Sequence, residues 1–385
     1  MNRVEELIQQ LCPNGVEWKK LGEVCELCRG TVITQKEAIK GNVPVISGGQ
    51  TPAYFHNKAN RPGNTIVVAG SGAYAGFVSF WEIPIFVSDA FTIKPHNELN
   101  VKFVFYFLKT IQHRIYATKK GAGIPHVHGS SIQNFDIPIP PLPIQQEIVR
   151  ILDTLTELNT NLQTELEARK KQYAYYRDCL LNFEGVKGVE WKKLGEVGTF
   201  IRGNGLQKKD FTESGIGCIH YGQIYTYYNI STDSTKSYVD CELAKNLTKV
   251  NKGDIIIACT SENIEDICKA VAWLGNDTIV TGGHACVFKH RENPKFISYY
   301  LQSEFFFQQK KKYARGAKVI DIKASDLAKI EIPIPPLSEQ RRIVSILDQF
   351  ETLVNDLSIG LPAELEARRK QYEYYRDKLL TFDRV

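Results

Sequence analysis

One helical stretch, written twice, decides the architecture: ELEARKKQYAYYRDCLLNF at Glu165–Phe183 and ELEARRKQYEYYRDKLLTF at Glu364–Phe382. The two differ at only four of their 19 positions. A second stretch, GVEWKKLGEV, stands unchanged at Gly15–Val24 and Gly188–Val197. A repeat at about half the chain length is typical of two copies of one unit rather than of a solenoid. The 385-residue chain is therefore predicted to be an internal duplication with pseudo-two-fold character.

The two copies share their ends and differ in between. The offset in residue number between them is 173 at GVEWKKLGEV (188 − 15), 195 at the motif IPIPPL (332 − 137) and 199 at ELEAR (364 − 165). Between the shared ends, residues 29–86 and 202–279 have no obvious sequence in common. We interpret the shared ends as a repeated frame that holds two variable inserts. One architecture with two different inserts is typical of a protein that recognises two different things.

Each IPIPPL motif is followed by a long helical pattern. Apolar residues recur there at three- and four-residue steps, which is coiled-coil spacing, over about Gln145–Asn182 and Glu339–Thr381. The preceding prolines hold the backbone extended before each helix begins. Because so long a helix is not a globular core by itself, we expect the two to pair antiparallel. The predicted seam consists of Leu155, Leu162, Leu166, Phe350, Leu357 and Leu365.

The second long helix contains Gly360-Leu361-Pro362, which predicts a local distortion rather than two separate helices. The inserts have a different pattern: short apolar runs led by turns, at Ile66–Ala69 and Ile255–Ala258, predict strands. Residues 103–115 and 296–307 have helical spacing. The predicted fold class is α+β, with two mixed α/β globular domains joined by two long helices that form an antiparallel coiled coil. The expected segments are an N-terminal helix (1–14), a first domain (15–143), a central helix (144–183), a second domain (184–337) and a C-terminal helix (338–385).

Positive charge is concentrated in the inserts. The chain has a formal net charge of +5; residues 15–143 carry +5 and residues 184–337 carry +3, whereas the helical segments are slightly acidic. Phosphate binding needs a local basic face rather than a high overall charge. No apolar run reaches the roughly 18–20 residues that span a bilayer, so no membrane association is expected. Nine scattered cysteines without framework spacing favour the reducing cytoplasm.

Taken together, the repeated motifs resemble the specificity (S) subunit of type I restriction–modification enzymes. The resemblance covers essentially the whole chain and occurs twice: IPIPPL, then a helix with Q…I…L-D, ending E-A-R-[KR]-K-Q-Y-x-Y-Y-R-D-x-L-L. It implies that each globule is a target recognition domain that reads one half of a split double-stranded DNA sequence. It also implies that the paired helices fix the distance between the halves. By the same resemblance, two methyltransferase (M) subunits dock on the frame, restriction (R) subunits join them, and the S subunit has no catalytic activity.

Two glycine loops are the candidate phosphate-binding elements. The offset of 195 aligns Gly121-Ala-Gly123 with Gly316-Ala-Lys318, and basic residues flank both. Glycine allows a backbone to approach phosphates closely. An ordinary basic surface loop is the alternative. The candidate residues are Lys119, Lys120, Gly121, Gly123, Arg315, Gly316 and Lys318, with the neighbouring run Lys310, Lys311 and Lys312.

Two further loops are candidates for reading bases. Gln50 and Thr51 follow two glycines, and Tyr221, Gln223 and Tyr225 lie in a similar run of small and polar residues. Glutamine can bind adenine through two hydrogen bonds. Plain turns are the alternative at both places. Elsewhere, the offset of 195 aligns His126 with Asp321 and Asp89 with His284, so no charged group at these two positions is common to both copies, which fits the reading of two sequences.

Motifs for catalysis and metal binding are missing from the sequence. There is no GxGxxG, no GxxxxGK[ST] and no [ND]-P-P-[YF] run, which argues against a fused methyltransferase or nuclease. The CxxC at Cys25–Cys28 has no second pair to complete a zinc site, so we expect neither metal nor cofactor. The remaining rival is a coiled-coil scaffold that does not bind DNA, which the uneven charge disfavours.

Overall fold

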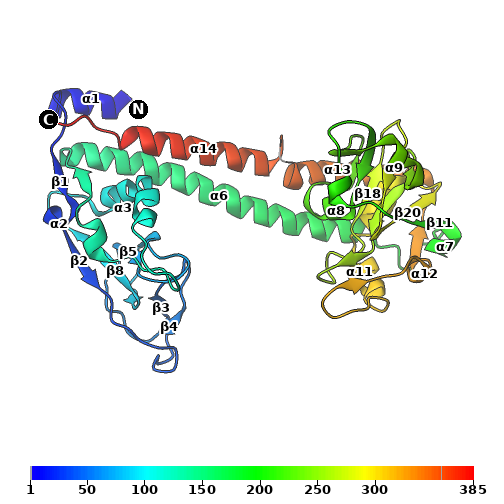
Figure 1. Ribbon diagram of the computed structural model, residues 1–385, viewed down its shortest axis with the longest axis horizontal. Helices are drawn as coiled ribbons and strands as arrows, with labels where there is room; N and C mark the ends of the chain where they lie inside the picture. The colour runs from blue at the N-terminus through cyan, green and yellow to red at the C-terminus, as the bar shows by residue number, and fades with distance from the viewer. Residues whose placement is uncertain (1, 357) are drawn as a thin grey trace. The chain divides into compact units, whose positions relative to one another are not determined.

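The structure, a computed structural model, describes residues 2–356 and 358–385 (Figure 1). The chain forms two compact units: unit 1 comprises Met1–Leu162 with Leu365–Val385, and unit 2 comprises Gln163–Glu364. The 39-residue helix α6 (Leu142–Leu180) contributes its first part to unit 1 and its second part to unit 2. Each unit thus combines one insert with part of the long helices.

Unit 1 is a mixed α/β domain built on a four-stranded antiparallel sheet of order β2-β8-β5-β6. A three-stranded sheet, β4-β3-β7, and a two-stranded sheet, β1-β9, belong to the same unit. Its elements besides α6 are α1 (Asn2–Leu11), β1 (Trp18–Lys20), α2 (Leu21–Val24), β2 (Cys25–Arg29), β3 (Val43–Ile46), β4 (Tyr54–His56), β5 (Thr65–Ala69), β6 (Val78–Trp81), β7 (Phe86–Val87), β8 (Ala90–Pro95), α3 (Val101–Thr110), α4 (Gln112–Ala117), α5 (Gly129–Ile132) and β9 (Asp136–Pro138).

Unit 2 is built the same way on a five-stranded sheet of order β11-β20-β16-β18-β13. A four-stranded sheet, β14-β12-β19-β15, and the pairs β10-β22 and β17-β21 complete it. Its elements are β10 (Glu190–Lys193), α7 (Leu194–Val197), β11 (Gly198–Arg202), η1 (Lys208–Asp210), β12 (Ile216–Ile219), α8 (Tyr221–Thr226), β13 (Ser231–Thr232), β14 (Ser237–Val239), α9 (Cys241–Asn246), β15 (Thr248–Val250), β16 (Ile255–Ala258), β17 (Thr260–Ser261), β18 (Ala270–Trp273), β19 (Ile279–Thr281), β20 (Ala285–His290), α10 (Pro294–Tyr300), α11 (Glu304–Lys310), β21 (Ile320–Asp321), α12 (Ala324–Leu327), β22 (Glu331–Ile334) and α13 (Leu337–Asn355).

The duplicated motifs form the same local structure in both units. The tryptophan strand pairs with the IPIPPL strand in one register, Trp18 opposite Pro138 and Trp191 opposite Pro333. The strands predicted at Ile66–Ala69 and Ile255–Ala258 are confirmed as the buried strands β5 and β16. Each helical stretch predicted in the inserts is present as two short helices, α3 with α4 and α10 with α11. The α+β class with two mixed domains is confirmed.

The long helices pack against each other within each unit. In unit 1, Ile148 and Leu152 of α6 share a core with Leu379 of α14 (Leu361–Leu379), and α6 and α14 run side by side in opposite directions (Figure 1). In unit 2, the rings of Tyr173 and Tyr176 stack on Phe350 of α13 at 6.3 and 5.6 Å.

The predicted seam residues differ in their burial. Leu155 packs against the core of unit 1, and Leu166 is 5% exposed in unit 2. Leu162 and Leu365 are half-buried, and Leu357 lies outside the described residues.

The prediction of a local distortion rather than two separate helices is wrong, because the C-terminal segment forms two helices, α13 and α14. The chain leaves the helix at Asp356 (ψ 121°), and helix begins again at Leu361. The Asp356 carboxylate accepts hydrogen bonds from the backbone N–H groups of Ser358 (2.7 Å) and Ile359 (3.2 Å), which stabilises the turn against further helix. Pro362 lies in the first turn of α14, where its missing N–H costs little.

A buried glutamine lies in the first turn of each long helix and fixes it to its domain. Gln145 is fully buried; its amide donates to the carbonyls of Pro140 (2.7 Å) and Glu98 (3.0 Å) and accepts from the N–H of Asn100 (2.7 Å). In unit 2, the amide of Gln340 donates to the carbonyl of Pro335 (2.8 Å) and accepts from the N–H of Asn293 (2.9 Å). Buried polar groups must be paired, so this network fixes the glutamine and the loop together.

The partners of these glutamines are helix caps in turn. Asn100 caps α3 and Asn293 caps α10, each through two backbone N–H groups. Further along each long helix, the hydroxyl of Tyr106 donates to Asp153 (2.6 Å) in unit 1, and that of Tyr299 donates to Asp348 (2.7 Å) in unit 2. The Q…I…L-D motif thus corresponds to two polar anchors on each long helix.

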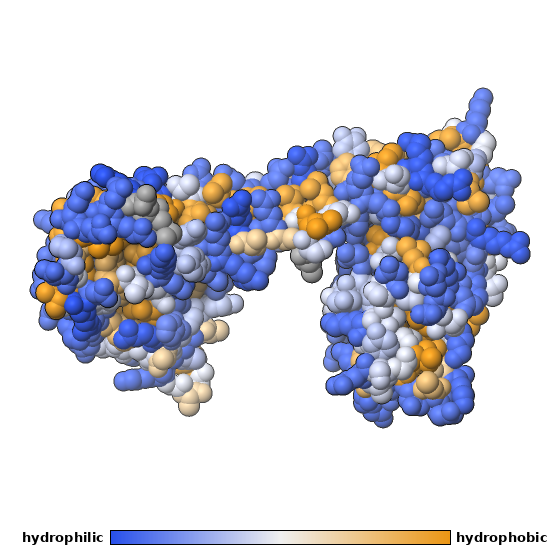
Figure 2. All heavy atoms as spheres, turned by 90° about the horizontal axis from the view of Figure 1, so that it is seen from above, coloured by the Kyte–Doolittle hydropathy of each residue, from blue (hydrophilic) through white to orange (hydrophobic). Residues whose placement is uncertain are grey.

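Hydrophilic side chains cover most of the visible surface of each unit (Figure 2). In the described part of the chain, no helix is both long enough and apolar enough to span a membrane.

Candidate nucleic-acid interface

The two predicted glycine loops are closed hairpins of identical pairing. In unit 1, the backbone N–H of Lys120 donates to the carbonyl of His126 (2.9 Å) and that of His126 donates back (2.8 Å). In unit 2, Arg315 and Asp321 exchange the same two bonds at 3.1 and 2.8 Å. We call these segments, residues 119–126 and 314–321, the basic hairpins. The offset of 195 found in the sequence is therefore also a structural equivalence.

Glycine is required at the same position of both hairpins. Gly121 has φ +109° and Gly316 has φ +114°, a region that side chains disfavour. A Cβ atom would also lie 2.7 Å from the carbonyl oxygen of Ile124 and 2.0 Å from that of Val319, respectively. Gly123 differs, because a Cβ there would meet nothing within 4 Å and its φ is ordinary.

The basic hairpins present their cations to solvent. Lys120, Arg315 and Lys318 are exposed. Arg315 lies 3.8 Å from Asp326, and its side chain is 70% exposed, whereas Asp326 is buried and forms a shorter ion pair with Lys329 (2.7 Å). Lys119 is half-buried: its Nζ donates to the carbonyl of Ala73 (3.2 Å) and lies over the ring of Tyr116. A phosphate contact by any of the four remains a prediction.

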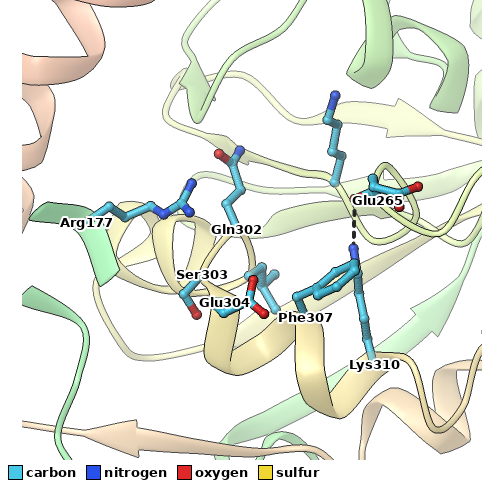
Figure 3. A pocket seen from close by; sticks show the side chains of 9 residues that line it. Arg177, Glu265, Gln302, Ser303, Glu304, Phe307 and Lys310 are labelled. Atoms are coloured by element: carbon cyan, nitrogen blue, oxygen red, sulfur yellow. Dashed lines mark hydrogen bonds between the residues drawn. The ribbon is translucent and has the colours of Figure 1, made fainter. Parts of the chain in front are cut away.

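The position of Lys310 differs from the expected solvated patch. Its side chain is only 4% exposed, and its Nζ donates to the backbone carbonyl of Glu265 (2.9 Å; Figure 3). It also donates to the backbone carbonyl of Ile267 (2.6 Å). Burial lowers the pKa of this ammonium group. Lys310 therefore anchors α11 to the 265–267 loop and is not presented to a phosphate, whereas Lys311 and Lys312 are exposed. Three consecutive lysines suggest a single surface patch in the sequence. Successive side chains of a helix point in different directions, however, so one of the three can point inward.

Gln50 and Thr51 are exposed in the loop between β3 and β4. This loop lies against the segment that pairs with the basic hairpin of unit 1. A Cβ on Gly48 would lie 2.3 Å from the carbonyl oxygen of Ser71, and Ser71 forms a β-bridge with His126. The loop and the hairpin are therefore neighbours, although their residues are about 70 positions apart.

The polar groups predicted to read bases in unit 2 have structural partners. The amide of Gln223 accepts from the N–H of His220 (2.9 Å) and donates to the hydroxyl of Ser237 (2.7 Å). The Tyr225 hydroxyl donates to the carbonyl of Thr260 (2.7 Å), and burial raises its pKa. The polar groups of Gln223 and Tyr225 thus already have partners within the domain, and their reading of bases stays a prediction. Tyr221 is half-buried, and its ring lies 5.0 Å from that of His284.

Comparison with known proteins gives the family. The model of the type I restriction modification DNA specificity domain matches twice, over residues 13–168 and 187–367. The chain belongs to the specificity subunits of type I restriction–modification systems. The resemblance found in the sequence is confirmed, and the two matches coincide with the duplication.

Known specificity subunits resemble this one over nearly their whole length. A putative type I restriction enzyme specificity subunit from Haemophilus influenzae is 31% identical over 388 residues, which is 95% of this chain and 96% of the relative. The EcoR124I/EcoR124II specificity subunit of Escherichia coli is 31% identical over 95% of this chain and 94% of its own. Among solved structures, the type I S subunit of M. genitalium matches with a TM-score of 0.61 at 18% identity, covering 97% of this chain and 98% of the other. A structure described in connection with complex assembly of the type I system matches with a TM-score of 0.62 at 19% identity, covering 96% and 98%. At these identities, the two structures support the fold.

Sequence reasoning missed two arginines of this specificity subunit. Arg29 ends β2 and Arg202 ends β11, and each lines a cleft beside the basic hairpin of its own unit. The signal was available: both arginines follow the repeated GVEWKKLGEV stretch at the same offset of 173. It was passed over because both positions were assigned to the start of the variable inserts.

Proposed function

We propose that this specificity subunit binds double-stranded DNA at a bipartite, asymmetric sequence, one half-site for each domain, and docks two methyltransferase subunits. The observation that carries the proposal is the pair of basic hairpins. The same backbone bonds, the same positive-φ glycine and exposed cations recur in two domains whose inserts differ. Contacts to the phosphate backbone need no sequence information, so a repeated element suits them.

The differences between the inserts support two different half-sites. Sequence is read by side chains that reach base edges, so two domains with different side chains beside like hairpins are expected to select different bases. An asymmetric target follows, because two identical readers related by a two-fold axis would select a palindrome. In this proposal, the chain itself transfers no methyl group and cuts no DNA.

Docking of two copies of one partner is supported by equivalent aromatic residues on the long helices. Tyr175 is 65% exposed on α6, and Tyr374, at the offset of 199, is 61% exposed on α14. Their neighbours Tyr173 and Tyr372 are instead packed within the units. Exposed tyrosines are enriched at protein interfaces, and two equal surfaces suit two equal partners. Recruitment of restriction subunits through those partners is part of the same proposal.

Exchanging one domain tests the division of labour between the two. Residues 184–337 would be replaced by the corresponding domain of another specificity subunit, and the chain expressed with its methyltransferase partner. Methylome sequencing should show a change in one half-site only. The reciprocal exchange of residues 15–143 is the matched control and should change only the other half-site.

Two results would contradict the proposal. A palindromic wild-type target, or a change of both half-sites on one exchange, would show that the domains do not read separately. A complex of the chain with its methyltransferase partner that fails to shift DNA in a gel would favour the scaffold alternative instead.

A further inference from the structure

Each unit has a small cleft directly beside its basic hairpin. In unit 1 the cleft measures about 150 Å³, and Arg29, Asp89, His126 and His128 contribute charged or polar groups to it. His126 belongs to the hairpin itself, and its ring stacks on that of His128 at 6.2 Å. The hydroxyl of Ser71 donates to the Asp89 carboxylate and orients it. The cleft is also lined by residues of β8 and of the segment after β5.

The cleft of unit 2 is the same site in the second copy. It measures about 250 Å³ and is lined by Arg202, His284, Asp321 and Lys323, among others. Three sets of backbone bonds establish the equivalence: Gly30 to Ala90 matches Gly203 to Ala285, Val127 to Gly70 matches Ile322 to Cys259, and the closing bonds of the two hairpins match each other.

The two clefts contain the same kinds of group at exchanged positions. Unit 1 has aspartate at 89 and histidine at 126; unit 2 has histidine at 284 and aspartate at 321. Compared one position at a time, these two pairs of residues have nothing in common. Compared as clefts, each holds one arginine, one carboxylate and at least one imidazole.

The guanidinium N–H donors of Arg29 and Arg202 are available to a ligand. Among the described residues, the guanidinium groups of Arg29 and Arg202 form no hydrogen bond or ion pair, and both side chains are exposed. Arginine presents two parallel N–H donors that match the O6 and N7 acceptors of guanine. A carboxylate accepts from the amino group of cytosine, and histidine can donate or accept.

The carboxylates decide between a phosphate and a base edge. A phosphate in either cleft would lie beside the negative charge of Asp89 or Asp321, and like charges at close range repel. The edge of a base pair in the major groove presents both acceptors and donors, which a cleft with both a cation and a carboxylate complements. The exposed cations of the neighbouring hairpin are placed to hold the phosphates on either side.

We propose that these two clefts are the base-reading sites of the domains, each accepting a base-pair edge in the major groove. Arg29 with Asp89 and His126 selects the base in one half-site, and Arg202 with His284 and Asp321 selects it in the other. The exchange of acid and imidazole across the cleft makes the two half-sites different. This inference rests on the proposed function, since it assigns residues within the domains that read DNA.

The test uses the full chain with its methyltransferase partner and removes one charge at a time. Asp321→Asn and Arg29→Gln each change one cleft, and Asp233→Asn and Arg3→Gln make the same changes at exposed positions outside both clefts. The methylated motif is mapped by methylome sequencing. Binding to matched and mismatched duplexes is measured against salt concentration, and thermal unfolding verifies that each variant is folded.

The expected result is a loss of discrimination at one base pair of one half-site, by roughly tenfold to a hundredfold, with the other half-site unchanged. The controls should retain the wild-type motif. Asp321→Asn should change two quantities in opposite directions. Removal of the negative charge should raise the affinity for nonspecific DNA, while discrimination between bases falls. If one variant does not fold, the variant of the other cleft carries the test.

Two results would overturn the inference. An unchanged motif with unchanged discrimination in both variants would show that the clefts do not read bases. Equal weakening of all sequences by Arg29→Gln, with a salt slope lower by about 1, would assign that cleft to phosphate instead. Failure of the proposed function is distinguishable, because then the wild-type complex would itself lack a bipartite motif.

Discussion

Unit 1 and unit 2 share the polar contacts that hold a long helix in its domain and differ in their small second sheets. Both use a buried glutamine, a capping asparagine and a tyrosine–aspartate pair to attach a long helix to a shorter one, α3 or α10. The small second sheets differ: β4-β3-β7 has three strands, and β14-β12-β19-β15 has four. Of the extra residues in the second copy, 22 precede the IPIPPL motif (195 − 173) and four lie between it and ELEAR (199 − 195). The comparison shows that a polar network can keep an architecture constant while the surface beside it changes.

The largest expected effect comes from breaking that network. Gln145→Leu and Gln340→Leu keep the side-chain volume but leave buried backbone groups unpaired, which should destabilise the affected unit by about 3 kcal/mol. Because the two networks match, the two losses should be nearly equal. Urea denaturation followed by hydrogen exchange of each unit would measure them.

The matched control is Gln163→Leu, which changes an exposed glutamine of the same helix α6 and should cost little. If only one of the two buried glutamines lowered the free energy of unfolding strongly when replaced, the two networks would not contribute equally to stability.

The next effect is expected at the glycines of the basic hairpins. Gly316→Ala introduces a Cβ atom that would lie 2.0 Å from a carbonyl oxygen, at a backbone angle that alanine disfavours. We expect a cost of about 2 kcal/mol, local to the hairpin, with weaker DNA binding. Gly121→Ala should cost less, because its closest approach is 2.7 Å.

Gly123→Ala is the control, since a Cβ there meets nothing within 4 Å. Hydrogen exchange of the hairpin amides and the dissociation constant for the target duplex would be compared. Protection that is equally retained in all three variants would contradict a structural role for the glycines.

The sequence predicted the elements that repeat and failed on side chains whose partners lie far along the chain. Strands β5 and β16 and the start of both long helices follow from local apolar patterns and proline rules. The break at Asp356 was missed because it depends on one carboxylate that accepts from the turn after it. Gly360 and Pro362 indicated a distortion of the helix there, but not that the helix would end and begin again.

The candidate site shows the same limit more strongly. The basic hairpins were predicted because both copies carry glycine and cations at one offset. The burial of Lys310 and the hydrogen bonds of Gln223 were not foreseen, because their partners, the 265–267 carbonyls and Ser237, are about 45 and 14 residues away. The clefts were missed because aspartate and histidine exchange places, and a comparison made position by position registers only a difference.

The third prediction separates surface cations from the buried one. Lys120→Gln and Lys318→Gln should each weaken binding to all duplexes about equally and lower the salt slope by about 0.9. Lys310→Met should leave that slope unchanged and lower the stability of unit 2, because it removes an ammonium bound to two carbonyls. Binding of a nonspecific duplex at several salt concentrations measures both. A slope that falls for Lys310→Met would mean that the side chain leaves its buried position on DNA.

The smallest expected effect is a pH dependence of stability at one position where the contacts between the long helices differ in the two units. Glu351 of α13 is equivalent, at the offset of 195, to Thr156 of α6. Thr156 interacts with the hydroxyl of Tyr372, and Glu351 lies beside Tyr173 and accepts from the amide of Asn355 (3.0 Å). Burial raises the pKa of the Glu351 carboxyl above its ordinary 4.5. Unit 2 therefore carries an ionisable group that its counterpart lacks.

The pH dependence follows from the direction in which burial moves this pKa. Well below pH 4.5 the carboxyl is protonated in the folded and unfolded states alike, so it does not affect stability. As pH rises above 4.5, the unfolded state releases its proton first, and the folded state is progressively destabilised until the pH has passed the raised pKa of the folded state. A tenfold difference in proton affinity between the two states corresponds to about 1.4 kcal/mol.

Glu351→Gln should therefore raise the melting temperature at pH 7 and leave it unchanged near pH 4, because the amide carries no charge at either pH. Thermal unfolding at the two pH values measures this. Thr156→Ser, the control in unit 1, should show no such dependence. Equal stabilisation by Glu351→Gln at both pH values would mean that the charge of Glu351 is not the cause, and that the two units tolerate this position alike.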